Sequence, residues 1–404
     1  MRKGKALIRI SLLLFIVFIF SPLQGATASD TIKLGCLEPF SGDFKDVGER
    51  YFEGVEYAAQ VINENGGLLG KKVEVVPIDS EVKPAVAMQK ATKELQKNNI
   101  RFFCGGTGSS VGAAMSAFAE RQDAIFFTYG MDASSMTGKK CNKHFFRPGG
   151  STDGRSFALA QYLAQTDLKR VAMIAQDYSF GQEAVAAFKK KIKELKPEVD
   201  LVAEIYHPIG TKDFAPYISQ IVASEPDAIF TSNWGNDLTL LLRQGASMGM
   251  KGKLFCYYIN DPVLLQSVDD SSVLGAVGAE IYMLSAPTEE NETFKKKFKA
   301  DKGYYPSWLR GKAYTATMFW AEAIKKANST EADAVIKAWE GLKFEGPAGT
   351  WHMRACDHQA QVPYWVGEIV KDNPYFDHAY VGPAQEIDAE AVSVPCEETG
   401  CEMK

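Results

Sequence analysis

From Thr31 onward, short apolar runs alternate with segments whose apolar residues recur every three or four positions. The short runs are typical of buried β-strands, and the periodic segments are typical of helices. The first such helical segment ends at Gly66-Gly67, a helix-stop signal. Strict alternation of strand and helix favours a parallel sheet with right-handed crossovers. The strands predicted in this first unit are 32–37, 73–78, 100–104 and 124–128, and the helices include 85–97 and 110–121.

The same alternation restarts after Gly149-Gly150. The predicted strands there are 170–176, 201–206, 228–232, 254–258 and 279–284, with helices at 181–195, 213–224 and 236–248. Three more helices are predicted near 292–302, 307–327 and 332–342, before strand and turn over 351–370. A chain of 404 residues also exceeds the roughly 250–300 residues of a single core. We therefore predict an α/β fold of two doubly wound, parallel-sheet lobes, with Gly149-Gly150 at their first crossing.

The first 28 residues have the pattern of a cleavable signal peptide. Four basic residues precede an apolar run over 10–20, and Ala26-Thr27-Ala28 supplies a small-x-small cleavage pattern. The apolar run is shorter than the ~20 residues that a membrane-spanning helix needs. We therefore predict export to the periplasm and a mature chain that begins at Ser29.

Charge and cysteine content narrow the class of protein further. Removal of the signal peptide takes away four positive charges, so the formal net charge falls from −5 to −9. This acidic balance argues against nucleic acid as a partner, because nucleic-acid sites need clustered lysine and arginine. The seven cysteines all lie in the exported part, where disulfides can form, and an odd number leaves at least one unpaired within the chain. Cys396 and Cys401 could close a short loop, and Cys36 and Cys104 end neighbouring predicted strands; the pairing stays open.

The first candidate binding residues follow the third predicted strand. In open α/β sheets, ligands lie beyond the carboxyl ends of the strands. There, a glycine-rich turn leads into Ser109 and Ser110 at the start of a predicted helix. Their hydroxyls and the free backbone N–H groups suit a carboxylate or another oxygen-rich group, although serine is also a common N-cap. No lysine follows in the P-loop pattern, so a nucleotide is not expected.

The other strand ends supply a second set of candidates. Gly130, Met131 and Asp132 follow the fourth strand, and Asp132 could either pair with a ligand ammonium or cap the next turn. In the second unit, aromatic residues stand at strand ends, where they could form an apolar wall with polar handles or simply pack in the core. These residues are Tyr178, Phe180, Trp234, Tyr257 and Tyr258.

Two other kinds of site are alternatives to a binding cleft. Residues 108–112 match the G-x-S-x-G elbow of serine hydrolases, with Ser110 as nucleophile, but no His-Gly-Gly type oxyanion loop is present. His352, Cys356 and His358 share one face of a predicted strand and are metal-ligand types, although structural packing is the commoner use. We expect neither a metal nor a cofactor.

Three motifs carry a resemblance to a known family. They are Ile32-Lys33-Leu34-Gly35 with Phe40-Ser41-Gly42, the run Ile62-Asn63…Gly66-Gly67-Leu68-Leu69-Gly70, and Asp177-Tyr178-Ser179-Phe180-Gly181. The chain resembles the type I periplasmic binding proteins, and within them the leucine/isoleucine/valine-binding proteins of branched-chain amino acid ABC transporters. The resemblance implies two lobes joined by a three-crossing hinge. The lobes expected are 29–148 with 285–345 and 149–284 with 346–382, followed by an extended tail over 383–404.

The resemblance also implies roles for particular residues. Ser109 matches the serine that holds the ligand carboxylate, and Gly130 to Asp132 match the loop that contacts carboxylate and ammonium. Phe180 and Trp234 stand where the family often has aromatic residues that face the ligand. The chain departs from the family where Met131-Asp132 replace a small residue and threonine. It departs again at Ile259-Asn260, where the family's acidic ammonium partner would fall and only the adjacent Asp261 is acidic.

These implications describe a binding protein, not an enzyme. The expected function is the substrate-binding subunit of an ABC importer that delivers a small molecule to permease subunits and acts as a monomer. The ligand is an amino acid, branched-chain or similar, or a related amide or small carboxylate, aromatic or aliphatic. A secreted serine hydrolase that uses Ser110 and a ligand-binding subunit of a sensory receptor are the alternatives.

Overall fold

Two groups of elements build the part of the chain that the structure describes. The structure is a computed structural model in which Met1 and residues 31–403 are described. The predicted signal peptide, apart from Met1, therefore lies outside the described residues. Among those residues, no helix is long and apolar enough to cross a membrane.

The first lobe is organised around a five-stranded parallel sheet with the order β2-β1-β3-β4-β5. Its strands are β1 (Ile32–Glu38), β2 (Val73–Asp79), β3 (Phe102–Gly105), β4 (Ile125–Thr128) and β5 (Phe145–Phe146). The helices α1 (Lys45–Glu64), α2 (Pro84–Asn98) and α3 (Ser109–Arg121) follow the first three strands, and the short helix η1 (Ser134–Met136) follows β4. Strand β1 lies between β2 and β3, so the winding direction reverses there, and a crevice forms at the carboxyl ends of such strands.

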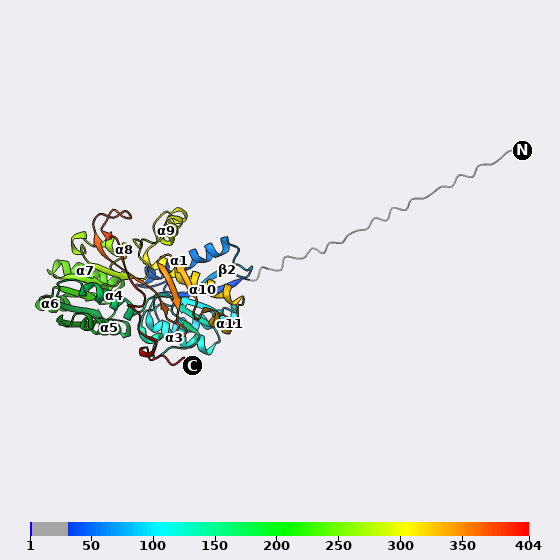
Figure 1. Ribbon diagram of the computed structural model, residues 1–404, viewed down its shortest axis with the longest axis horizontal. Coiled ribbons are helices and arrows are strands. Elements are labelled where there is room, and N and C mark those ends of the chain that lie inside the picture. The colour runs from blue at the N-terminus through cyan, green and yellow to red at the C-terminus, as the bar shows by residue number, and fades with distance from the viewer. Residues whose placement is uncertain (2–30, 404) are drawn as a thin grey trace. The chain divides into compact units, whose positions relative to one another are not determined.

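The second lobe contains an eight-stranded sheet. Its strands β10, β9, β8, β6 and β7 pair in parallel in that order, which confirms the predicted parallel architecture. These strands are β6 (Arg170–Gln176), β7 (Asp200–His207), β8 (Ala228–Thr231), β9 (Lys253–Cys256) and β10 (Val277–Glu280). The helices of this lobe are α4 (Thr152–Ala164), α5 (Ser179–Leu195), α6 (Ala215–Ala223), α7 (Gly235–Ser247), α8 (Pro262–Ser267) and the short η2 (Asp270–Ser272). Figure 1 shows α4 to α7 gathered around this sheet.

The edge of the second sheet was not predicted as such. Strand β14 (Tyr364–Val370) pairs antiparallel with β10, and β15 (Tyr380–Val381) and β16 (Gln385–Ile387) pair antiparallel with β14. The inner strands are continuous apolar runs because helices cover both faces of the sheet. Strands β3, β4 and β8 are accordingly buried along their whole length.

Residues 289–361 pack on the first lobe. They form α9 (Glu289–Lys302), α10 (Trp308–Ala327), α11 (Ala332–Trp339), and a three-stranded sheet of β11 (Lys343–Gly346), β12 (Gly349–Met353) and β13 (Ala360–Gln361). Helix α10 approaches α1 so closely that a Cβ on Gly54 would lie 2.5 Å from the Arg310 carbonyl oxygen. Trp339 stacks on Phe146 with ring centroids 4.4 Å apart. The predicted lobe boundary between 345 and 346 thus falls inside the β11–β12 hairpin, whose strands pair with each other.

The chain passes between the two groups of elements three times, at 147–151, 281–288 and 362–363. The first passage contains the predicted Gly149-Gly150, and its backbone lies against both lobes. A Cβ on Gly149 would be 3.0 Å from the Tyr129 Cα, and one on Gly150 would be 2.6 Å from the Tyr364 hydroxyl. A larger residue at either position would therefore push the hinge segments apart.

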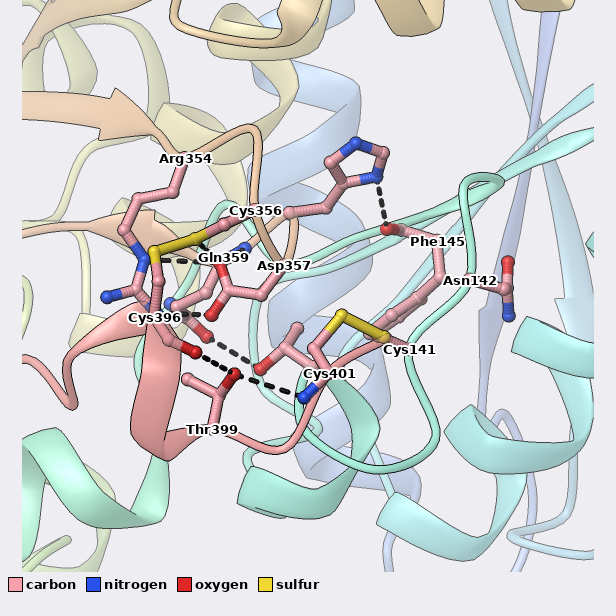
Figure 2. Close-up of a disulfide and its surroundings, with 12 residues drawn as sticks. Cys141, Asn142, Phe145, Arg354, Cys356, Asp357, Gln359, Cys396, Thr399 and Cys401 are labelled. Carbon is pink, nitrogen blue, oxygen red and sulfur yellow. Dashed lines mark hydrogen bonds and ion pairs between the residues drawn. A yellow bond between two sulfur atoms is a disulfide. The ribbon is translucent and has the colours of Figure 1, made fainter. Parts of the chain in front are cut away.

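The C-terminal segment is tied to the body rather than extended and free. Disulfides join Cys141 to Cys401 and Cys356 to Cys396, the latter in the short helix η3 (Cys396–Glu398) (Figure 2). Together with β16, they anchor the segment predicted as an extended tail over 383–404 at both lobes. The sequence could not show this because each partner is distant, 260 and 40 residues away.

The disulfides correct two sequence-based interpretations. The short loop between Cys396 and Cys401 does not form, because each pairs elsewhere. Cys356 is unavailable as a metal ligand for the same reason, and the described residues hold no cluster of histidine, cysteine and acidic side chains suited to a metal. The remaining cysteines are buried free thiols: Cys36, Cys104 and Cys256. Cys36 and Cys104 are register partners on β1 and β3, as expected for the ends of neighbouring strands.

Candidate ligand-binding site

A cavity of about 230 Å³ lies at the carboxyl ends of strands from both lobes. The first lobe lines it with α1, the loop between β3 and α3, Gly130 and Trp308. The second lobe lines it with the segments that follow β6, β8 and β9. The volume lies somewhat below the roughly 300–1,000 Å³ of pockets for drug-sized ligands, so it suits a molecule about as large as an amino acid.

Six of the ten candidate residues line this cavity: Ser109, Gly130, Tyr178, Phe180, Trp234 and Tyr258. Ser109 is the first residue of α3, while Tyr178 and Trp234 are extended residues directly before α5 and α7. Each of these three residues thus lies where a strand leads into a helix, and the fold brings the three turns to one place. Their roles toward a ligand stay predictions.

Gly130 is a glycine because the Tyr51 side chain occupies the space beside it. A Cβ at this position would lie 2.2 Å from the Tyr51 hydroxyl oxygen and 2.7 Å from the Gly106 carbonyl oxygen. Tyr51 comes from α1 and is only 3% exposed. The loop after β4 therefore fits its neighbours only when it carries no side chain here.

Three predicted residues lie outside the cavity lining for simple packing reasons. The Ser110 side chain is exposed on the first turn of α3. The Met131 side chain is fully buried, and its Sδ would lie 2.7 Å from a Cβ on Gly112 of α3. Tyr257 is also fully buried, and its hydroxyl donates to the Thr152 carbonyl at 2.9 Å. Its neighbour Tyr258 lines the cavity instead, since successive residues at a strand end point to opposite faces.

Asp132 is the fourth predicted residue outside the lining, and its carboxylate already has a cationic partner. Arg155 of α4 donates to it at 2.7 Å and to Glu280 at 2.8 Å, with all three side chains fully buried. Lys312 of α10 lies 3.4 Å from the second Glu280 oxygen. Burial alone would raise the pKa of Asp132, but Arg155 and Lys312 outweigh it and hold that pKa below its usual value. Asp132 is thus a charged member of a buried network, not a free acid.

The glycine-rich loop before α3 is held by a residue that sequence analysis missed. Glu38, at the end of β1, accepts hydrogen bonds from the Gly106 N–H, the Thr107 hydroxyl and the Tyr129 hydroxyl at 2.6–2.7 Å. Burial raises the pKa of Glu38 to about 8, although these hydrogen bonds and Lys312 lower it in part. Near pH 7 the carboxyl is therefore mostly neutral. A glutamate that closes a strand whose preceding residues from Leu34 to Leu37 carry no charge was the signal available in the sequence.

The raised pKa of Glu38 makes a prediction about stability. Between its ordinary value of 4.5 and about 8, the folded state holds a proton that the unfolded chain releases. Stability from this group is therefore full below pH 4.5 and is lost as pH rises through 8. The Glu38→Gln variant keeps the loop contacts but cannot ionise. We expect wild type to lose about 2 kcal/mol more than this variant between pH 6 and 8, measured by urea unfolding. Parallel pH profiles would contradict a proton on Glu38.

The family profile for periplasmic binding proteins matches residues 31–374. The chain belongs to the periplasmic binding protein family. Within that family it is a type I protein of the branched-chain amino acid group. Members of the family bind solutes and are not enzymes, and the family implies a periplasmic location.

Relatives of this periplasmic binding protein cover almost the whole described chain. The Leu/Ile/Val-binding protein homolog 4 of Brucella abortus is 28% identical over 370 residues, 86% of each chain. The closed crystal structure of a leucine-, isoleucine-, valine-, threonine- and alanine-binding protein from Brucella ovis superposes with a TM-score of 0.85 at 24% identity, covering 93% of this chain and 99% of that one. A solute-binding protein from R. palustris in complex with benzoate reaches 0.79 at 20% identity, covering 92% and 100%. These two structures share the two-lobed fold.

Direct contacts link the lobes of the periplasmic binding protein across the cavity. Arg50 of α1 donates from one nitrogen to both oxygens of Asp261, at 2.8 and 2.9 Å, and both residues are less than a tenth exposed. Phe44, before α1, packs on Trp234 with ring centroids 4.6 Å apart. The Trp234 Nε1–H donates to the Tyr178 hydroxyl oxygen at 2.9 Å. Arg50, Phe44 and Asp261 were not predicted, because each pair joins segments about 200 residues apart.

Ser110 lacks the partners that a catalytic serine needs. Among the described residues, no histidine hydrogen-bonds to it. The three histidines that could follow it in a hydrolase have other surroundings: His352 lies in β12, His358 is buried against Phe146 and bonds to Glu340, and His378 stacks on Phe376. The exposed hydroxyl in this periplasmic binding protein is therefore a helix-surface group.

Proposed function

We propose that this protein is the substrate-binding subunit of an ABC importer. It captures one small solute that bears a carboxylate or amide, such as a branched-chain amino acid, between its lobes and delivers it to permease subunits. The observation that carries this proposal is a cavity lined from both lobes at strand ends and bridged by Arg50–Asp261 and Phe44–Trp234. A ligand that touches both lobes favours the closed arrangement, which a permease can recognise.

The names of the relatives support this function class. The Brucella abortus relative is named for leucine, isoleucine and valine, whereas the R. palustris structure holds benzoate. Both kinds of ligand are small carboxylates with an apolar body. We further propose that residues 1–28 direct the chain to the periplasm and are removed there, and that the mature protein works as a monomer.

Ligand capture is tested by thermal melting of the purified protein against amino acids, amides and aromatic acids. A ligand at 100 times its dissociation constant should stabilise the protein by about 2.7 kcal/mol. The Trp234→Ala variant removes the contact with Phe44 and the hydrogen bond to Tyr178. We expect it to bind the ligand at least tenfold more weakly, by isothermal titration.

The matched control is Tyr304→Ala, which removes an exposed aromatic ring outside the cavity. Its affinity should equal that of wild type. Unchanged binding by Trp234→Ala, or a panel in which no compound raises the melting temperature, would remove the support for this site.

Transport is distinguished from sensing by the physical partner. An importer subunit that carries its ligand should stimulate ATP hydrolysis by its membrane-embedded permease complex. A receptor subunit would bind the same ligand without that stimulation, so this assay decides between the two classes.

A further inference from the structure

The hydrogen-bonding groups that line the cavity are unevenly divided between donors and acceptors. Trp308, the first residue of α10, is 5% exposed, and its Nε1–H has no hydrogen-bond partner among the described residues. An indole nitrogen can only donate, so a buried one without an acceptor is costly. A ligand oxygen in the cavity would supply the missing acceptor.

The start of α3 adds further donors at the same cavity. The first bond of this helix runs from the Gly112 N–H to the Gly108 carbonyl, so the N–H groups of the preceding turn have no partner within the helix. No side chain caps this end. The Ser109 oxygen accepts from the Ala133 N–H at 3.3 Å, which leaves its own hydrogen free to donate. Free donors and the positive end of a 13-residue helix both favour an anion.

The acids of the cavity, by contrast, are already paired. They are Asp43, Asp46 and Asp261. Asp261 accepts from Arg50 with both oxygens and also caps α8 through the Val263 N–H. Asp46 lies 2.6 Å from the second Arg50 nitrogen, and exposed Asp43 lies 3.8 Å from Lys212. A ligand ammonium at Asp261 would have to compete with Arg50 for the same carboxylate.

The charges behind the cavity wall also give no support for a ligand ammonium. The Lys312 Nζ lies 4.5 Å from the ring centroid of Trp308, and the Arg155 guanidinium lies 4.8 Å from that of Tyr258. Both rings line the cavity, and both cations are fully buried. The two buried acids beside them, Asp132 and Glu280, only neutralise these cations. The buried network behind the wall is therefore balanced, two cations against two acids, and adds no net negative charge for an ammonium group.

The rest of the lining fits a flat or branched apolar body. Six aromatic side chains take part: Tyr51, Tyr178, Phe180, Trp234, Tyr258 and Trp308. Tyr258 and Trp308 stack with centroids 5.0 Å apart, and Leu238 and Leu264 add aliphatic surface to the wall. Burial of apolar ligand surface here would supply most of the affinity.

We propose that the solute bound in this cleft is a carboxylate with an aromatic or branched apolar body and no cationic amine. This inference rests on the proposed function and narrows its ligand class. The carboxylate accepts from the α3 N-terminus and Ser109, a ligand oxygen accepts from Trp308 Nε1, and the body lies against the aromatic wall.

The decisive experiment compares pairs of ligands that differ only in the amine. Isothermal titration of the purified protein at pH 7 would use 4-methylpentanoate against leucine, and 3-phenylpropanoate against phenylalanine. We expect at least one deamino acid to bind ten times more tightly than its amino acid, or better. If leucine or phenylalanine binds as tightly as its partner or more so, the ligand class is overturned while capture in the cleft stands. If no member of either pair binds, the ligand class is overturned, and the melting panel of amino acids, amides and aromatic acids decides whether capture in the cleft stands.

A pair of variants tests the role of the indole donor. Trp308→Phe removes the unpartnered N–H at the cavity, and Trp320→Phe removes another unpartnered buried N–H from the same helix, away from the cavity. We expect Trp308→Phe to weaken binding of the preferred carboxylate about tenfold, as for a hydrogen bond to a charged group, and Trp320→Phe to change it less than twofold. Equal effects of the two variants, each checked for native melting, would overturn the assignment of Trp308.

Discussion

Replacement of Arg155 by methionine is expected to lower the free energy of unfolding by about 3–5 kcal/mol. The guanidinium is the shared partner of Asp132 and Glu280, and all three side chains are fully buried. Without it, two carboxylates remain in the core with only Lys312 in direct contact with one of them, and an incompletely compensated buried charge is costly. Urea unfolding of wild type and variant measures the difference.

Two further variants make the test specific to the buried network. Lys45→Met removes a surface pair with Glu49, whose members are each more than half exposed, and should change stability by less than about 1 kcal/mol. The double variant Arg155→Met with Asp132→Asn should regain part of the loss, because Glu280 then keeps Lys312 as its partner. A loss no larger than that of Lys45→Met would show that the network adds little.

The second large effect is expected from the disulfides. Cys141→Ser combined with Cys401→Ser should lower the free energy of unfolding by about 2–4 kcal/mol, because the bond restrains a loop of 260 residues in the unfolded chain. A larger cost should appear when wild type is unfolded with a reductant present, because the reductant also opens the bond between Cys356 and Cys396. Reductant should have little further effect on a variant that lacks all four bonded cysteines.

The thiol content gives an independent check on the same pairing. Unfolded but unreduced protein should expose three reactive thiols, from Cys36, Cys104 and Cys256, and the native protein should expose almost none because all three are buried. A count of five or seven would contradict one or both disulfides.

The strand-end rule predicted the part of the site that local sequence controls. Ser109, Tyr178 and Trp234 were predictable because each lies in a contiguous segment of strand, short turn and helix, whose pattern is visible in the local sequence. The turn places such a side chain at the carboxyl end of its strand without the help of contacts from distant parts of the chain. Between the adjacent Tyr257 and Tyr258, however, the sequence offers no way to tell which one faces the cavity.

Residues whose role depends on a distant partner could not be predicted. The sequence shows no partner for Asp132, because Arg155, which pairs with it, comes from α4, beyond the first crossing. Arg50 and Asp261 are separated by 211 residues, and Trp308 reaches the cavity only because α10 packs on α1. The antiparallel edge of the second sheet was missed for a related reason, since β14 returns to β10 only after the excursion through residues 289–361.

The disulfide pattern also sets an order of events during biogenesis. Each bond joins a cysteine of the body to one beyond residue 395, so neither can form until residues 396 and 401 have reached the oxidising compartment. Both sheets can assemble earlier and enclose Cys36, Cys104 and Cys256 within the core. Only the four cysteines that form the disulfides would then remain accessible to oxidation. Folding before oxidation would therefore prevent mispairing with the three buried thiols.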